Sequence, residues 1–164
     1  VLDATAGLGR DSFVLADLGC EVILCEREPV IAELLRAGMH VAAGRRDPWL
    51  DEVLGRMQLH PADARSLPAD RLRQVDVIYL DPMFPQRGKS AAVKKEMALF
   101  QLLLARADAQ DDADDLLGWA LRLGAARVVV KRPPRATSLR GQKPSHSVAG
   151  KAVRYDVYVQ RKLG

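Results

Sequence analysis

The sequence predicts an α/β fold, a doubly wound and mostly parallel sheet within one domain that spans residues 1–164. Short apolar, β-branched runs alternate with amphipathic stretches, which is the pattern of strands separated by helices. The 164 residues are 48% hydrophobic, which is enough for one substantial core but little for two. No internal repeat or low-complexity linker divides the chain. Because residues 1–3 read as the end of a strand, we expect a missing N-terminal portion.

Complete strands are expected at residues 21–26, 57–60, 75–81, 126–131 and 152–160, with the end of another at 1–3. Two sets of apolar residues recur with helical spacing: Ile31, Leu34, Leu35 and Ala42, and then Leu116, Leu117, Ala120 and Leu121. Asp111 and Asp112 precede the second set and Gly124 follows it, as helix start and stop signals do. Both helices are expected to pack on the sheet.

Composition predicts a cytoplasmic protein with no metal site and no membrane span. No apolar run approaches the roughly 18 residues of a membrane span, and the chain does not open on a signal-like segment. Cys20 and Cys25 form neither a Cys-x-x-Cys pair nor a cluster with histidines. We therefore interpret both cysteines as reduced and mostly buried.

Positive charge gathers in the last fifth of the chain. Residues 131–164 hold nine Lys or Arg against one acid, Asp156, a net charge of +8, whereas residues 1–130 carry −4. A polyanion would be held by this basic part, although a basic surface can also serve solubility alone. Other features must decide between the two.

A glycine turn follows the first strand, where residues 3–11 read Asp-Ala-Thr-Ala-Gly-Leu-Gly-Arg-Asp. Gly7 and Gly9 lack the Cβ that would keep a ligand from the backbone, and the N-terminus of the next helix offers free N–H groups. With Ser12 in the third glycine position, the turn also nearly matches a dinucleotide fingerprint. A nicotinamide-dependent oxidoreductase is therefore kept as an alternative.

Acidic residues follow the next two strands. Glu26 can accept hydrogen bonds from both hydroxyls of a ribose, although it could instead cap the helix that begins near Pro29. Asp63 could accept from an adenine amino group, and the Ala64 N–H could face a ring nitrogen, although both could simply shape a loop. These positions predict a nucleoside cofactor without choosing one.

The turn after the fourth strand decides between the cofactors, because it reads Asp81-Pro82-Met83-Phe84. An exocyclic amine is a poor nucleophile, so its lone pair must be aimed at the methyl donor. Asp81 and the Pro82 carbonyl can accept the two amine hydrogens, while Phe84 stacks on a flipped-out base. In the structural alternative Phe84 fills the core and Asp81 caps a helix. Hydride transfer has no use for this set of residues.

Two basic clusters are expected to flank that turn and hold phosphates. The first comprises Arg87, Lys89, Lys94 and Lys95, and the second begins with Lys131 and Arg132 after the fifth strand. The carboxyl ends of strands in a doubly wound sheet share one crevice, so both clusters should lie beside one site. A solvated helix face is the alternative for the first cluster.

The order of these motifs resembles that of class I methyltransferases. More narrowly, the stretches at 3–11, 79–85, 89–90, 93–97, 128–133 and 154–158 are similar to the RsmJ family, guanine-N2 methyltransferases of small-subunit (16S) ribosomal RNA. Thr5 stands where many methyltransferases have a glycine, and Met83 replaces the second proline of the usual Asp-Pro-Pro-Tyr turn. Both departures are typical of the narrower family, and the resemblance runs nearly end to end.

The resemblance implies a Rossmann-like class I fold with an antiparallel C-terminal strand. It also implies S-adenosylmethionine as cofactor, S-adenosylhomocysteine as product, and ribosomal RNA or the small ribosomal subunit as partner. The implied cofactor site comprises the turn residues Asp3, Gly7 and Gly9, Arg10 and Asp11 at the methionine end, Glu26 and Arg27 at the ribose, Asp63 and Ala64 at the adenine, and Asp81 between cofactor and base.

Three alternatives stay open beside this assignment. They are the nicotinamide-dependent oxidoreductase, a non-catalytic RNA-binding module with the same fold, and an amino-methyltransferase that acts on adenine or on DNA. Stacking plus two acceptors serves any exocyclic amine, so guanine comes from the resemblance alone. The residues do not set an oligomeric state.

Overall fold

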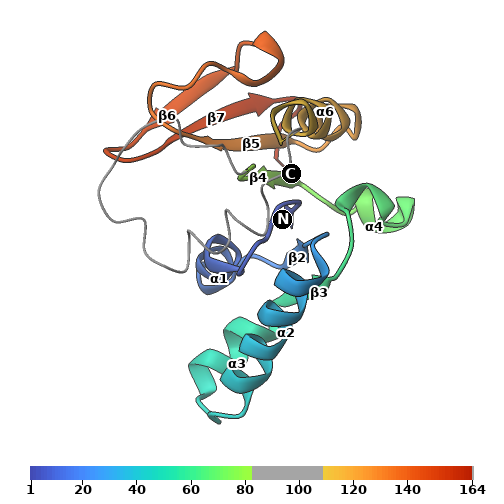
Figure 1. The fold of residues 1–164 in the computed structure, drawn as a ribbon, viewed down its shortest axis with the longest axis vertical. Coiled ribbons are helices and arrows are strands. Elements are labelled where there is room, and N and C mark those ends of the chain that lie inside the picture. The colour runs from blue at the N-terminus through green and yellow to red at the C-terminus, as the bar shows by residue number, and fades with distance from the viewer. Residues whose placement is uncertain (83–108, 164) are drawn as a thin grey trace.

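The structure is a computed structural model that describes residues 1–82 and 109–163, built around one sheet (Figure 1). In the described residues the sheet has seven strands in the order β3-β2-β1-β4-β5-β7-β6. They are β1 (Leu2–Asp3), β2 (Val22–Cys25), β3 (Met57–His60), β4 (Val77–Leu80), β5 (Arg127–Arg132), β6 (His146–Ala149) and β7 (Arg154–Val159).

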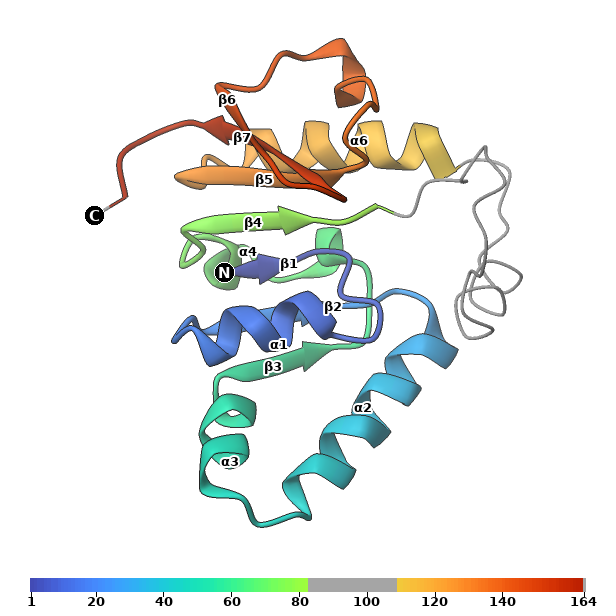
Figure 2. The ribbon, with the colours of Figure 1, turned by 90° about the vertical axis from the view of Figure 1, so that its left-hand side faces the viewer.

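Strands β1 to β5 pair in parallel, so their carboxyl ends meet at one edge of the sheet (Figure 2). Strand β7 is antiparallel to both β5 and β6. The doubly wound, mostly parallel sheet and its antiparallel C-terminal strand are therefore confirmed.

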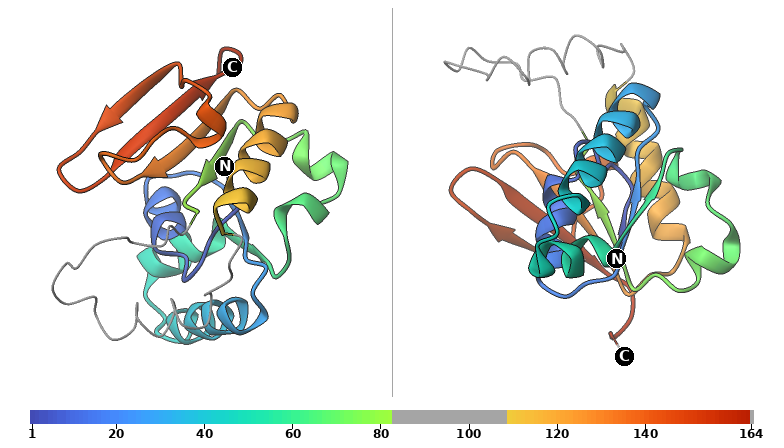
Figure 3. Two further views of the ribbon diagram at one scale, coloured as in Figure 1. Left: turned by 45° about the horizontal axis from the view of Figure 1, so that its top comes forward. Right: turned by 90° about the horizontal axis from the view of Figure 1, so that it is seen from below.

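Helices cover both faces of the sheet, as Figure 3 shows. One face carries α1 (Arg10–Asp17), α2 (Pro29–Ala43) and α3 (Pro48–Gly55), and the other carries α4 (Ala69–Leu72) and α6 (Ala109–Arg122). Two short 3-10 helices, η1 (Ala64–Ser66) and η2 (Leu139–Gly141), lie in loops. A separate apolar cluster fills each face, with Leu24 and Leu35 in one and Ile78 and Leu117 in the other.

The expected strands are all present, with ends that differ by up to two residues. Strand β6 was not expected, because all four of its residues are exposed and it carries no apolar run. Asp111 and Asp112 lie inside helix α6 (Ala109–Arg122) rather than before it. Leu34 is 52% exposed, so the expected buried face of α2 was wrong at that residue, whereas Ile31 and Leu35 are buried as expected.

Cys25 is buried and Cys20 is half-buried, and neither forms a disulfide. Within residues 1–82 and 109–163, no helix combines the length and the apolar character that crossing a membrane requires. The same residues contain no group of three His, Cys, Asp or Glu side chains arranged to hold a metal ion.

Candidate functional site

The glycine turn leaves β1 and enters α1 with two residues in the left-handed region. Gly7 has φ of +55° and Gly9, the N-cap of α1, has φ of +73°. A Cβ at Gly9 would stand 2.8 Å from Leu35 Cδ1, so this glycine lets α2 approach the turn. A Cβ at Gly7 would meet nothing within 4 Å. Gly7 therefore borders open space, where a ligand can approach the backbone.

Asp3 is buried beneath the glycine turn, with 2% of its surface exposed, and it holds the turn through two hydrogen bonds. One carboxylate oxygen accepts the Thr5 N–H at 3.0 Å and the other accepts the Ser12 hydroxyl at 2.5 Å. Burial raises the pKa of Asp3 to about 6, against the effect of these two hydrogen bonds. Ser12 occupies the third glycine position of the dinucleotide fingerprint, and its use as a buried donor explains why a glycine would not serve there.

Glu26 ties the end of β2 to the same turn. Its Oε2 accepts the Gly7 N–H and its Oε1 accepts the Glu28 N–H, both at 2.8 Å. Glu28, not Glu26, is the N-cap residue of α2. Each carboxylate oxygen has a second lone pair, so Glu26 can hold the loop and still accept from ribose hydroxyls.

A surface network of alternating charges lies beyond Glu26, at the position expected for the adenine. Arg65 donates from Nε and Nη2 to both oxygens of Asp63, at 2.8 and 2.6 Å. Arg27 pairs with Asp112 at 2.7 Å and lies 3.9 Å from Asp63. These hydrogen bonds from Arg65 lower the pKa of Asp63. Ala64, by contrast, is buried.

A cluster of hydrogen-bonded polar side chains lies where β4 and β5 end beside α1. It consists of Asp11, Tyr79, Asp81 and Lys131, and we call it the acceptor cluster. Lys131 Nζ donates to Asp11 Oδ2 at 2.7 Å and to Asp81 Oδ2 at 2.9 Å. The Tyr79 hydroxyl donates to Asp11 Oδ2 at 2.6 Å. The Asp81 N–H donates to the Thr5 hydroxyl at 2.7 Å, which joins the cluster to the glycine turn.

Burial and charge act against each other in the acceptor cluster. Burial raises the pKa of Asp81, and the hydrogen bond from Lys131 only partly offsets this effect. Burial also raises the pKa of Asp11, but the donors Lys131 and Tyr79 outweigh it and leave that pKa below its usual value. For Lys131 the two carboxylates outweigh burial, so its pKa is raised and the ammonium stays charged.

The structure brings together the expected site residues of the first four strands, but it separates the expected RNA contacts. Lys131 faces two carboxylates rather than open solvent. Arg132 is 3% exposed on the opposite face of β5 and donates to the Thr137 carbonyl, so it does not offer its charge to a phosphate. Five further predicted residues lie outside the described residues: Phe84, Arg87, Lys89, Lys94 and Lys95.

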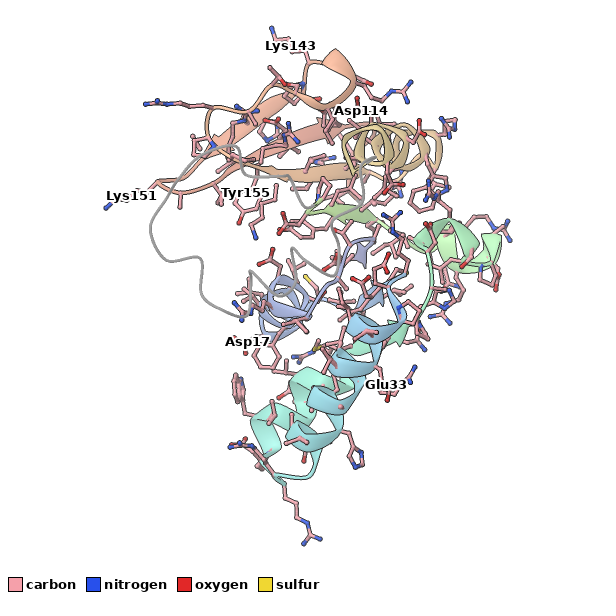
Figure 4. The ribbon with its side chains drawn as sticks, in the orientation of Figure 1. Asp17, Glu33, Asp114, Lys143, Lys151 and Tyr155 are labelled. Carbon is pink, nitrogen blue, oxygen red and sulfur yellow. The ribbon has the colours of Figure 1, made fainter. Side chains whose placement is uncertain are left out.

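Three residues that contact predicted site residues were not themselves predicted to belong to the site: Tyr79, Arg65 and Asp112. Tyr79 lies in β4 two positions before Asp81, which directly follows the strand, so alternation would have placed the two side chains on one face. Tyr155 pairs with Lys131 across β5 and β7, and it projects from β7 on the side of α1 (Figure 4). Arg65 and Asp112 are distant in sequence, and no local pattern joins them.

The sheet order, the glycine turn and the acids at the strand ends define a Rossmann-like class I methyltransferase domain. A family model described as a putative SAM-dependent methyltransferase matches residues 1–160. The chain belongs to this family of S-adenosylmethionine-dependent methyltransferases.

Curated relatives are similar over nearly the whole chain. The ribosomal RNA small subunit methyltransferase J of Thioalkalivibrio sulfidiphilus is 56% identical over 97% of this chain and 61% of its own length. The protein of the same name from Shewanella amazonensis is 52% identical over 100% of this chain and 64% of its own length. The chain thus spans somewhat less than two thirds of these relatives.

Solved structures agree with this placement. A SAM-dependent methyltransferase from Neisseria gonorrhoeae is 36% identical, with a TM-score of 0.72 over 99% of this chain and 66% of that chain. An RNA methyltransferase from Salinibacter ruber in complex with S-adenosylhomocysteine has a TM-score of 0.60 at 13% identity, over 99% of this chain and 80% of that chain. The second likeness shows the fold alone.

Proposed function

We propose that this chain carries the active site of an enzyme that methylates small-subunit ribosomal RNA, and that its target is the exocyclic N2 amine of a guanine. The observation that carries the proposal is the position of Asp81. It follows β4 and is joined to the glycine turn both by Thr5 and, through Lys131, by Asp11. The names of the curated relatives supply the substrate class, and the resemblance to the RsmJ family supplies the base.

The residues around the glycine turn fit S-adenosylmethionine. Gly7 borders open space, Glu26 reaches the turn, and the carboxylate of Asp11 suits a ligand that carries sulfonium and ammonium charges. The cofactor would supply a methyl carbon that an amine can attack directly, with the neutral thioether as the leaving group. Asp63 and Arg27 would border the adenine and ribose.

Asp81 and Pro82 would aim the amine of the acceptor base. Oδ2 of Asp81 is held by Lys131, and within the described residues Oδ1 accepts no hydrogen bond. Oδ1 and the Pro82 carbonyl can therefore take the two amine hydrogens, while stacking by Phe84 remains a prediction outside the described residues. No strong base is needed, because the proton leaves the nitrogen easily once the methyl group has arrived.

Exposed basic residues beside the site would hold the RNA backbone. Arg135 lies in the loop after β5, Lys143 lies in the loop between η2 and β6, and Lys151 lies in the turn of the β6–β7 hairpin, which Figure 4 shows at the outer side of the sheet. With the predicted contacts of Arg87, Lys89, Lys94 and Lys95, they would make RNA affinity fall as salt rises. Such an enzyme would act in the cytoplasm, on RNA or on the small subunit.

The test is transfer of labelled methyl from S-adenosylmethionine to unmodified small-subunit ribosomal RNA, naked and in assembled subunits. Nucleoside digestion should place the label in N2-methylguanosine. Label in another base or in DNA would replace the guanine assignment with another exocyclic amine. An absence of label despite measured S-adenosylhomocysteine binding would overturn the RNA substrate.

Asp81→Ala should lower turnover by on the order of a hundredfold, because the amine loses the acceptor that aims its lone pair. The Kd for S-adenosylhomocysteine, measured by calorimetry, should change by less than about threefold. Asp76→Ala, which removes an exposed carboxylate from the loop before β4, is the control. Equal losses of cofactor affinity and turnover would assign Asp81 to cofactor binding and contradict the proposed role.

A further inference from the structure

Lys131 has the burial and contacts of a structural cation rather than those of a phosphate ligand. Its side chain is 23% exposed, and its ammonium donates to two carboxylates that come from different elements. Asp11 belongs to the first turn of α1, and Asp81 follows β4. A phosphate that approached this ammonium would also meet both carboxylates, which would repel it.

Two contacts hold Asp81, one at its carboxylate and one at its backbone. Lys131 holds Oδ2 of the side chain, and the Thr5 hydroxyl accepts the Asp81 N–H. Asp11 is itself anchored by the hydroxyl of Tyr79, so Lys131 rests on a fixed partner. Charge-assisted hydrogen bonds of this kind are short and strongly directional. The hydrogen bond from Lys131 to Oδ2 therefore opposes a rotation of the Asp81 carboxylate that would turn Oδ1 away from the methyl-accepting amine.

We infer that Lys131 is a positioning residue that orients the Asp81 carboxylate toward the acceptor amine and couples it to the cofactor-facing carboxylate of Asp11. The inference rests on the proposed function, because it assigns Asp81 to the amine. It replaces the prediction, made from the sequence, that Lys131 holds an RNA phosphate. The neighbouring Arg132 points to the opposite face of β5, so the two basic residues have separate roles.

The same contact favours the charged form of Asp81, which accepts hydrogen bonds. Among residues 1–82 and 109–163, the titratable groups that face Asp81 are Lys131 from β5, Asp11 from α1, Asp3 from β1 and Tyr79 from β4. Among them only Lys131 lowers the pKa of Asp81, whereas burial and the negative charge of Asp11 raise it. Loss of the ammonium would raise this pKa further, so the acidic limb of the pH–rate profile would move to higher pH.

The experiment compares Lys131→Met and Lys131→Arg in the full chain by steady-state methyl transfer to small-subunit ribosomal RNA. At neutral pH, Lys131→Met should lower kcat by about tenfold or more, because the carboxylate is no longer aimed. KM for RNA and the Kd for S-adenosylhomocysteine should change by less than about threefold. The acidic limb should shift upward, and Lys131→Arg should restore most of the rate. Arg36→Met, which breaks an exposed pair with Glu33 on α2, is the control.

Other outcomes would overturn the inference. A raised KM for RNA with unchanged kcat would make Lys131 a phosphate ligand. A fall in Tm with a normal kcat and an unmoved acidic limb would make it only structural. If Lys131→Met does not fold, Lys131→Gln is judged by the same criteria. An active Asp81→Ala would defeat the proposed function itself, whereas an inactive Asp81→Ala with a normal Lys131→Met would defeat this inference alone.

Discussion

The two faces of the sheet near β5 differ in how their buried carboxylates are paired with cations. On the face of α6, Arg132, Ser147, Arg154 and Asp156 form what we call the hairpin cluster. Arg154 donates from Nε and Nη2 to the two oxygens of Asp156, at 2.8 and 2.9 Å. On the face of α1, Asp11 and Asp81 share Lys131, and in the described residues the buried Asp3 accepts only from neutral donors.

The pKa values follow this difference. Burial raises the pKa of Asp156, but Arg154 and Ser147 outweigh burial and leave it lowered. Asp3 has a serine partner, Ser12, but no cationic partner in the part of the chain that the structure describes, and its pKa rises to about 6. Asp156 is thus paired within the hairpin cluster, whereas the ends of the strands at Asp3, Asp11 and Asp81 carry an excess of negative charge that a cationic ligand could offset. The one-to-one pair of Arg154 and Asp156 fits a structural role, and the excess of carboxylates at the strand ends fits a binding role.

The hairpin cluster also shapes the loop that follows β5. Arg154 donates to the carbonyls of Pro134 and Ala136, at 3.1 and 2.9 Å, and Arg132 donates to the carbonyl of Thr137 at 2.5 Å. Asp156 therefore holds the guanidinium of Arg154, which in turn holds the backbone of the loop after β5. Removing that carboxylate should release the loop as well as the pair.

The largest effect on stability is expected for Asp156→Ala, which should lower the free energy of unfolding by about 3 kcal/mol because it leaves a partly buried guanidinium unpaired. Urea denaturation monitored by circular dichroism measures this change. The matched control is Asp76→Ala, which breaks an exposed 3.5 Å pair with Arg161 and should cost less than about 0.5 kcal/mol. Equal losses in the two variants would remove the contrast between balanced and surface charge.

Much of the fold could be predicted because strand and helix periods are local signals. The order of strands and acids along residues 1–81 was enough to expect one crevice, and the glycine turn, Glu26 and Asp81 do meet there. Prediction from the sequence was wrong where two adjacent residues point to opposite faces of a strand. Lys131 and Arg132 were predicted as one basic cluster, yet strand alternation places them on opposite faces.

The contacts that assemble the site from distant residues could not be predicted. Lys131 lies 120 residues from Asp11 in the chain, and Tyr79 lies 68 residues from it. Hydrophobic periodicity sets which face a residue occupies, but the pairing register sets which polar groups touch. In the register of β4 and β5, Leu80 pairs with Val130, so Asp81 and Lys131 follow side by side at the ends of the two strands.

A smaller effect is expected from the pH dependence of stability at Asp3. Its pKa is about 6 in the folded chain against an ordinary value of 3.8, so between these values the folded state holds the proton more tightly. Stability should therefore fall as pH rises through this window, by about 2 kcal/mol, and change no further above it. Asp3→Asn should remove this slope in urea titrations from pH 4 to 7. A wild-type slope in that variant would assign the effect to other groups.

The smallest effect is expected for Ser147→Ala, which removes the hydroxyl that donates to Asp156 Oδ1 at 2.6 Å. The free energy of unfolding should fall by about 1 kcal/mol, because Arg154 still satisfies the carboxylate. A double-mutant cycle with Asp156→Asn separates this hydrogen bond from the strand preference of the serine. The cost should shrink in the Asp156→Asn background, since the acceptor there is neutral. An unchanged cost would mean that Ser147 acts through β6 alone, and that Arg154 and Asp156 balance their charges without it.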